Sequence, residues 1–207
     1  MTFEMQGTQY GGWMLDLEKV PEGSTVISAG IGEDISFDLA LIDKKKCKII
    51  GIDPTEKSHK YVESRKDITN FSLIKKALTD IDGDVVKMYR NSNPNHVSES
   101  VMSDHKAVNN FDCYLCETVS LKSLFEKYEN ISVIKMDIEG SEYDLINNLK
   151  SVPESVKQFC IEFHHFCSSK TIEDTKSIIE KMKKFGFLEF VEKPNSPKLT
   201  EITFYKK

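Results

Sequence analysis

Residues 26–38 read VISAGIGEDISFD, and this stretch decides how the rest of the chain is interpreted. An apolar, β-branched run ends abruptly at two glycines, Gly30 and Gly32, and a pair of acidic residues follows them. In a parallel α/β sheet, a glycine-rich turn between a strand and a helix is the place where the backbone passes close to a nucleotide-like ligand. The stretch therefore predicts a strand, a ligand-binding turn and a helix, in that order.

Similar apolar runs recur along the chain. Strands are expected at residues 24–30, 47–54, 71–79, 131–137 and 156–164, and helices at residues 55–66, 120–127, 141–149 and 171–185. This alternation predicts a doubly wound, Rossmann-like α/β fold, in which a mostly parallel sheet carries helices on both faces. Residues 185–207 depart from it with two β-like runs joined by PNSP, and indicate a C-terminal antiparallel hairpin.

Composition and charge narrow the classes of function. The 207 residues are 39% hydrophobic, and we expect a single domain over residues 1–207. The formal net charge of −5 argues against a nucleic-acid partner, because general binding of nucleic acid rests on clustered lysine and arginine. No apolar run is long enough to span a membrane, and the N-terminus lacks the pattern of a secretory signal. We therefore expect no membrane insertion and a cytoplasmic location.

The cysteines indicate neither a disulfide framework nor a metal site. Five cysteines, an odd number, fit a reducing compartment. Cys113 and Cys116 form a CxxC, but no second CxxC or nearby histidine pair completes a zinc site. Because the pair lies in a stretch that reads as a strand, the helix dipole that lowers the thiol pKa in redox CxxC motifs is missing.

Acidic residues near the glycine turn discriminate between cofactors. Asp53 ends the next predicted strand, about twenty residues further on, where an acidic side chain binds ribose hydroxyls. A dinucleotide fold usually has a third glycine, but here Glu33 and Asp34 come directly before that position, which is Ile35. Two carboxylates would repel a pyrophosphate, whereas they would attract the sulfonium and the amine of S-adenosylmethionine. Asp34 is equally compatible with a role as the N-cap of the helix.

A second motif, VIKMDIEGSEYDLI at residues 133–146, gathers carboxylates at the end of another strand. Asp137 ends the apolar run, Gly140 makes the turn, and Glu142 lies in the first turn of the next helix. An acidic side chain that ends a buried strand costs desolvation free energy unless something uses it. Asp137 is therefore a candidate catalytic residue. Glu142 is also compatible with a purely structural role, in which it complements the helix dipole.

This second motif resembles the hallmark of the FkbM family of S-adenosylmethionine-dependent methyltransferases, which pairs a lysine and a strand-end aspartate with a D-x-E-G-x-E core. Other segments follow the family's order over roughly residues 10–193, including the strand that ends at Asp53 and Pro54 and a third strand that contains Ala77. Many members have an acidic residue where this chain has Ser28. In that respect the chain resembles the branch related to metazoan methyltransferase-like proteins.

The resemblance implies a fold, a cofactor and a class of acceptor. The sheet is expected to be that of a Rossmann-like methyltransferase. The residues expected to bind S-adenosylmethionine are Ser28, Gly30, Gly32, Glu33, Asp34, Asp53, Pro54 and Ala77. Because family members commonly methylate hydroxyls of sugars or glycosylated products, a carbohydrate or glycan acceptor is implied. The size of the chain is close to that of the bare catalytic module, so it is also compatible with being part of a larger multidomain enzyme.

A third motif, FCIEFHHF at residues 159–166, supplies further candidate catalytic residues. Side chains alternate along a strand, so Glu162 and His164 share one face and His165 lies on the other. The resemblance places His164 next to the transferred methyl group, and a direct role is expected for His164 or His165. An aliphatic hydroxyl needs a base or a metal ion to react. Asp137 or His164 is a candidate base, and alternatively Asp137, Glu162 and His164 form a candidate site for Mg²⁺ or Mn²⁺.

Two irregular segments complete the sequence. Residues 91–110 are polar and long enough to form a lid or a substrate loop. Residues 1–23 are an N-terminal lead-in that contains YGGW, from Tyr10 to Trp13. This aromatic stretch is a candidate for stacking on a sugar ring, although Trp13 is equally compatible with the core.

Functions of two other classes share these features. A nicotinamide-dependent oxidoreductase would have the same sheet and Asp53, but it would tolerate Glu33 and Asp34 badly. A non-catalytic module that binds glycans, or that serves as a scaffold for a larger glycosyltransferase, would keep the fold without consuming the methyl donor.

Overall fold

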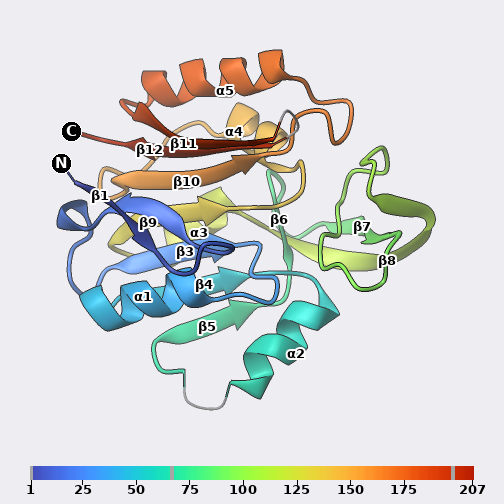
Figure 1. Ribbon diagram of the computed structural model, residues 1–207, viewed down its shortest axis with the longest axis horizontal. Helices are drawn as coiled ribbons and strands as arrows, with labels where there is room; N and C mark the ends of the chain where they lie inside the picture. Colours follow the sequence, from blue (N-terminus) through green and yellow to red (C-terminus); the bar gives the residue numbers. More distant parts are fainter. Residues whose placement is uncertain (1, 66–67, 197–198) are drawn as a thin grey trace.

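The computed structural model describes residues 2–65, 68–196 and 199–207. At its centre is a seven-stranded sheet with the strand order β11-β12-β10-β9-β3-β4-β5 (Figure 1). These strands are β3 (Thr25–Ala29), β4 (Lys48–Ile52), β5 (Phe71–Ile74), β9 (Ile131–Met136), β10 (Gln158–Phe163), β11 (Leu188–Ser196) and β12 (Leu199–Tyr205). Neighbouring strands from β10 to β5 are parallel, and β12 is antiparallel to both of its neighbours. The prediction of a mostly parallel, doubly wound α/β fold is therefore confirmed.

Helices cover both faces of this sheet (Figure 1). Apolar residues of α3 (Leu121–Lys127), α4 (Glu142–Asn148) and α5 (Ile172–Lys184) form the core on one face. On the other face the core is formed by α1 (Ser36–Lys45) together with β2 (Trp13–Asp16), which pairs with β1 (Phe3–Gln6) in an N-terminal hairpin. Successive strand residues point to opposite faces: Val133 belongs to the α1 core and Ile134 to the other. Trp13 is buried in the α1 core, which agrees with the core alternative for this residue.

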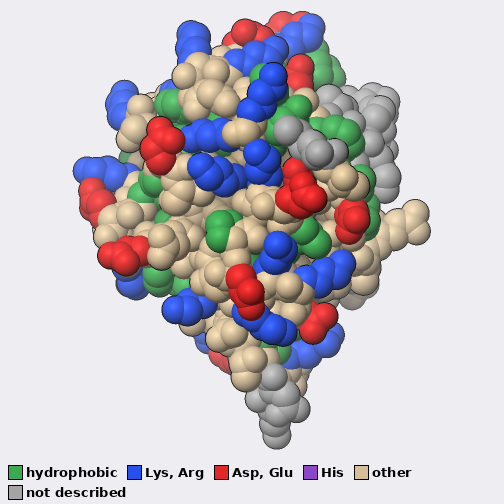
Figure 2. Space-filling view, turned by 90° about the vertical axis from the view of Figure 1, so that its left-hand side faces the viewer, with side chains coloured by type: hydrophobic (Ala, Val, Ile, Leu, Met, Phe, Trp, Pro, Cys, Tyr) green, Lys and Arg blue, Asp and Glu red, His purple; other side chains and the backbone are tan. Residues whose placement is uncertain are grey.

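The parallel register aligns the ends of four strands at one edge of the sheet. Ala29, the last residue of β3, pairs with both Ile52 of β4 and Met136 of β9. Met136 in turn pairs with Ile161, near the end of β10. The glycine turn and the strand-end acidic residues follow these positions, so the sequence motifs meet at the carboxyl edge of the sheet, as parallel α/β folds require. The opposite side of the molecule, shown in Figure 2, presents lysine and arginine side chains with acidic ones among them.

Residues 71–79 form two strands where the sequence predicts one. β5 belongs to the central sheet and ends at Ile74. β6 (Ala77–Thr79) instead joins a separate sheet with β8 (Val108–Ser120) and β7 (Val85–Asn91). Lys75 and Lys76 lie between β5 and β6 and form exposed ion pairs with Glu63 and Glu117. The charged ammonium groups of lysine side chains stay in water at little free-energy cost. The chain therefore leaves the central sheet at these two lysines.

In this second sheet, β7 is a strand that the sequence analysis omitted, and β8 is a strand that it identified. The strand interpretation of Cys113 and Cys116 is confirmed by β8, and both cysteines are free thiols.

The C-terminal segment forms the predicted antiparallel hairpin. β12 lies between β10 and β11, so the hairpin extends the sheet by two strands. Pro197, the last residue of PNSP, lies outside the described residues. Among the helices that the structure describes, none combines the length and the apolar character needed to cross a membrane.

Candidate active site

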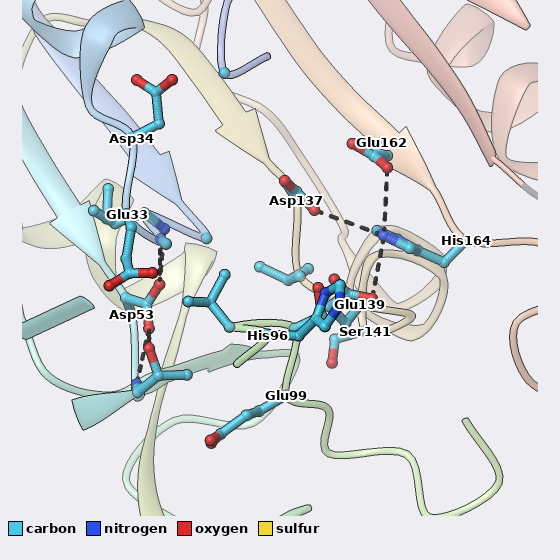
Figure 3. Close-up of a pocket in the computed structure, with 18 of the residues that line it drawn as sticks. Glu33, Asp34, Asp53, His96, Glu99, Asp137, Glu139, Ser141, Glu162 and His164 are labelled. Atoms are coloured by element: carbon cyan, nitrogen blue, oxygen red, sulfur yellow. Dashed lines mark hydrogen bonds and ion pairs between the residues drawn. The ribbon is translucent and has the colours of Figure 1, made fainter. Parts of the chain in front are cut away.

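A cavity of about 770 Å³ opens at the carboxyl edge of the sheet. Its walls are the glycine turn after β3, the residues that follow β4 and β9, the end of β10, and the segment between β7 and β8, residues 92–107. In Figure 3, Glu33 and Asp53 lie on one side of the view and His164 on the other. The volume falls within the range of roughly 300–1,000 Å³ that is typical of small-molecule sites.

At Gly30 the group that leaves no room for a side chain belongs to the protein itself. Its φ is +75°, and a Cβ atom here would overlap the carbonyl oxygen of Asp137 at the end of β9. Gly32 also has a positive φ, +54°, but its surroundings are open, and only Val97 would lie within contact distance of a Cβ atom. The interpretation that a ligand excludes a side chain at Gly30 is therefore corrected, since the neighbouring strand end does so.

Asp53 is fully engaged by the chain. Its Oδ2 accepts hydrogen bonds from the backbone N–H groups of Ile31 and Gly32, at 2.8 and 3.0 Å. Its Oδ1 accepts from the backbone N–H and the hydroxyl of Thr55, at 2.8 and 2.6 Å. A carboxylate offers about four acceptor sites, so none remains free. Asp53 thus ties the glycine turn to the end of β4.

Asp34 holds the start of α1. Its carboxylate accepts hydrogen bonds from the backbone N–H of Ser36 and from the hydroxyl of Thr8, both at 2.7 Å. Burial opposes ionisation, but the hydrogen bonds from Ser36 and Thr8 outweigh it and lower the pKa of Asp34. The N-cap position of α1 is Ile35, which makes no side-chain cap hydrogen bond, so the interpretation of Asp34 as the N-cap is wrong. Asp34 lies one residue earlier, binds the first N–H of the helix from there, and also lines the cavity.

The remaining predicted cofactor residues divide into two groups. Glu33, Pro54 and Ala77 line the cavity together with the two glycines. Ser28 is buried in β3, is absent from the cavity lining, and contributes to the environment of the buried Asp38 of α1 instead. The structure therefore does not bring Ser28 to the expected binding surface.

His164 lies at the centre of four carboxylates, which we call the His164 cluster. Its Nδ1 is 3.1 Å from Glu142 Oε1, and its Nε2 faces the other three groups. Those distances are 3.4 Å to Glu139 Oε2, 3.6 Å to Asp137 Oδ1 and 3.6 Å to Glu162 Oε1 (Figure 3). The cluster brings together Asp137, Glu162 and His164, as predicted, and adds Glu139 and Glu142.

Glu142 is more than a first-turn acidic residue of α4. Its side chain is 0% exposed and accepts hydrogen bonds from the backbone N–H groups of Gly140 and His164, each at 2.9 Å. Because an ionised carboxylate can only accept, the 3.1 Å contact makes His164 Nδ1 the donor. Glu142 therefore fixes the orientation of the His164 ring and leaves Nε2 directed at the other carboxylates.

Mutual repulsion and burial perturb the ionisation of the cluster. Burial, followed by the negative charge of Asp137, raises the pKa of Glu162 to about 8. Burial would lower the pKa of His164, but the charge and hydrogen bond of Glu142, with the charges of Glu139 and Asp137, raise it well above its ordinary value. Both shifts favour the protonated forms of His164 and Glu162 around neutral pH.

His165 lies away from this cluster. Its Nδ1 is 3.3 Å from the hydroxyl of Thr175 on α5, and it is absent from the cavity lining. His105, which the sequence analysis did not select, is buried with Nε2 3.3 Å from Glu139 Oε2. No local pattern singles out His105, whereas Glu139 is part of the D-x-E-G-x-E core that the sequence analysis quoted.

The sequence analysis interpreted residues 91–110 as a lid or a substrate loop. In the structure β7 ends at Asn91 and β8 begins at Val108, so the loop itself is residues 92–107, and we call this segment the lid. Lys57 of α2 (Glu56–Ser64) binds it at one end, by donating hydrogen bonds to the carbonyl oxygens of Pro94 and His96. Further along, the hydroxyl of Ser100 donates to the carbonyl of Glu139 at 2.6 Å. The lid thus lies against both α2 and the turn that follows β9.

The His164 cluster also has the composition of a metal site. Asp137, Glu162 and His164 each offer one ligand atom, and these three atoms lie within 4.8 Å of one another. Two carboxylates and an imidazole are ligands that divalent cations accept, and carboxylate oxygens suit Mg²⁺ and Mn²⁺.

Comparison with known proteins identifies the family. The sequence matches the family described as methyltransferase FkbM domain over residues 9–189. The chain belongs to the FkbM methyltransferase family. It is therefore an S-adenosylmethionine-dependent methyltransferase, which confirms the resemblance of the 133–146 motif and sets the nicotinamide alternative aside. No curated protein sequence matches the chain.

Several solved structures are similar to this FkbM methyltransferase at low sequence identity. The fibrillarin pre-rRNA processing protein of Methanococcus jannaschii is 12% identical, with a TM-score of 0.52, over 99% of this chain and 82% of that one. Precorrin-6y C5,15-methyltransferase from Geobacter metallireducens GS-15 is 10% identical, with a TM-score of 0.49, over 92% and 84%. TrmK of M. capricolum, solved with S-adenosyl-homocysteine, is 11% identical, with a TM-score of 0.46, over 93% and 69%.

Proposed function

We propose that this FkbM methyltransferase methylates a hydroxyl group of a sugar or glycan. The observation that carries the proposal is that Asp137, Glu162 and His164 lie in the same cavity as the glycine turn. A thiol or an amine needs little beyond correct positioning, whereas a hydroxyl needs a base or a metal ion beside it. This cavity offers both kinds of assistance within one cluster.

The residues around the glycine turn fit S-adenosylmethionine. Gly32 leaves open space on the cavity side, and the carboxylates of Glu33 and Asp34 suit a ligand that carries a sulfonium and an amine. Gly30, Gly32, Glu33, Pro54 and Ala77 are proposed to hold the cofactor, with Asp53 acting through the turn. When bound, S-adenosylmethionine supplies a methyl group on a positively charged sulfur, which is open to attack by an oxygen nucleophile.

Asp137 is proposed as the base for the acceptor hydroxyl. Its side chain is 35% exposed, so it is the member of the His164 cluster most open to an incoming acceptor. Burial raises its pKa, which makes the carboxylate a better proton acceptor near neutral pH. The imidazolium of His164, 3.6 Å away and fixed by Glu142, then holds the Asp137 carboxylate in position.

A divalent cation is the second way in which the same residues could activate a hydroxyl. Four carboxylates surround one imidazolium, so the cluster carries an excess of negative charge. We propose Asp137, Glu162 and His164 as the ligands of Mg²⁺ or Mn²⁺, with the cation replacing the proton that Glu162 retains. A bound cation would lower the pKa of an acceptor hydroxyl.

Charge on the cavity wall supports a neutral acceptor. The acidic residues of the wall are Glu33, Asp34, Asp53, Glu99, Asp137, Glu139, Glu162 and Glu201. Among the described residues that line it, Lys135 is the one lysine, and it donates to the carbonyl oxygen of Gly30. An anionic acceptor would be repelled by this wall. A neutral sugar, rich in hydroxyl groups, meets no such repulsion, and sugars are the acceptors that the family resemblance implies.

Consumption of S-adenosylmethionine tests the proposal. The protein is assayed with a panel of mono- and disaccharides, once with EDTA and once with Mg²⁺ or Mn²⁺. We expect at least one sugar to accelerate donor consumption, and Asp137→Asn to lower the rate by about 10²-fold or more, the scale of general base catalysis. Binding of S-adenosylhomocysteine should change little in the same variant.

A matched control and the alternatives complete this experiment. Asp144→Asn removes a carboxylate of α4 that pairs with Lys170 and does not line the large cavity, so it should keep full activity. Activity that is lost in EDTA and restored by Mg²⁺ or Mn²⁺ would assign the cluster to a cation, and activity that persists in EDTA would assign Asp137 as a base alone. Sugar binding without donor consumption would instead indicate a glycan-binding or scaffold module.

A further inference from the structure

The cavity contains one carboxylate that the proposed chemistry does not use. Glu99 belongs to the lid and lines the cavity together with Asp53 and Pro54 (Figure 3). It is half-buried and lies outside the His164 cluster. Its position raises the question of which group binds the adenosine part of the cofactor, because the sequence assigns that role to Asp53.

Asp53 is poorly placed to accept further hydrogen bonds. All four acceptor sites of its carboxylate are occupied by Ile31, Gly32 and Thr55, and the residue is only 4% exposed. A ligand that took one of these sites would leave a buried donor of the chain without a partner, which is unfavourable. Asp53 is therefore suited to hold the glycine turn in shape.

Glu99 has a free acceptor in the same cavity. Its Oε2 accepts a hydrogen bond from the hydroxyl of Tyr114 at 2.8 Å, whereas its Oε1 has no hydrogen bond to any residue that the structure describes. The Tyr114 hydroxyl also lies 3.4 Å from the carbonyl oxygen of Pro54, the residue after Asp53. Tyr114 consequently holds Glu99 close to the strand end where the adenosine moiety is expected.

The support behind Glu99 is itself fixed. Tyr114 extends from β8, and the guanidinium of Arg90 on β7 lies 4.7 Å from the centre of its ring. Arg90 is held in turn by Asp112 at 2.9 Å. A carboxylate oriented in advance in this way loses little conformational entropy when a ligand binds.

We propose that Glu99, rather than Asp53, is the carboxylate that accepts hydrogen bonds from the adenosine moiety of the cofactor. The donors available on that moiety are the two ribose hydroxyls and the 6-amino group of adenine, and a carboxylate accepts from either kind. The proposal rests on the S-adenosylmethionine dependence of the family and is independent of the acceptor. It makes the lid a part of the cofactor site.

Binding of S-adenosylhomocysteine and its analogues tests this assignment by calorimetry, without turnover. The analogues lack one donor each: the 2′-hydroxyl, the 3′-hydroxyl, or the 6-amino group, which is absent in the inosine form. We expect the wild type to bind at least one analogue about tenfold more weakly than S-adenosylhomocysteine, the value of one hydrogen bond. Glu99→Ala should weaken binding of the parent compound about tenfold and abolish that preference.

Two further variants distinguish the role of Asp53 from that of Glu99 in this binding preference. Asp53→Asn should lower the melting temperature while it keeps the preference for the parent compound. Tyr114→Phe should reduce the preference about threefold, because Glu99 loses its support, and this variant decides the matter if Asp53→Asn does not fold. Glu117→Ala is the matched control, since this exposed carboxylate of β8 pairs with Lys76 and lies outside the cavity lining.

The contrary results are distinct. The proposal is overturned if Glu99→Ala keeps the preference, if the wild type shows none, or if Asp53→Asn alone removes it. Failure of every protein, wild type included, to bind S-adenosylhomocysteine would contradict the cofactor assignment instead.

Discussion

At the scale of single residues, Gly30 shows how the chain's own backbone dictates a residue type. Gly30→Ala would drive a Cβ atom into the carbonyl oxygen of Asp137, in addition to straining a φ of +75°. We expect it to lower the free energy of unfolding by more than about 3 kcal/mol, measured in urea. Gly83→Ala is the matched control: its φ is +70° with open space around it, so only the left-handed strain of about 1–2 kcal/mol applies. Equal losses in the two variants would contradict the steric explanation.

At the scale of elements, the lid depends on α2 through Lys57, whose ammonium group donates to the carbonyl oxygens of Pro94 and His96. Lys57→Ala is expected to release this end of the lid, because two charge-assisted hydrogen bonds are lost. Amide hydrogen exchange at residues 92–97 should accelerate by about tenfold. Lys60→Ala, on the same helix and in an ion pair with Glu56, should leave exchange unchanged. Similar exchange in both variants would show that Lys57 does not secure the lid.

At the scale of the whole molecule, Gln158 joins the N-terminal hairpin of β1 and β2 to the central sheet. It is fully buried on β10, accepts a hydrogen bond from the backbone N–H of Asp16 and donates to its carbonyl, each at 2.9 Å. Gln158→Leu would remove the partner of both the backbone N–H and the carbonyl of Asp16. We therefore expect the free energy of unfolding, measured by heat or urea, to fall by about 2–4 kcal/mol. Thr203→Val is the comparison, since it removes the hydroxyl that donates to the carbonyl of Met14 in the same hairpin and lies 3.9 Å from Cys160 Sγ. It should cost about half as much. A negligible effect of Gln158→Leu would show that the two hydrogen bonds to Asp16 do not stabilise the attachment of the hairpin.

Much of the site followed from sequence because its residues lie next to strand ends. Parallel strands bring their carboxyl ends to one edge, so Gly32 and Asp137 were predictable neighbours from their places in the alternation of strands and helices. The place of His164 in the site was implied by the family resemblance. The break between β5 and β6 was not predictable in this way, because a run of β-forming residues gives no sign that its two halves pair with different strands.

By itself, the sequence determined the alternation of strands and helices in the central sheet, the edge at which the cavity lies and the family to which the chain belongs, because each of these depends on local patterns and motifs. Only the tertiary structure decided that Asp53 is saturated by the chain, that Glu142 orients His164, and that His105 of the lid lies against Glu139. These features depend on contacts between side chains and backbone groups far apart in sequence. Such contacts follow from the packing of the whole chain and leave no periodic signal along it.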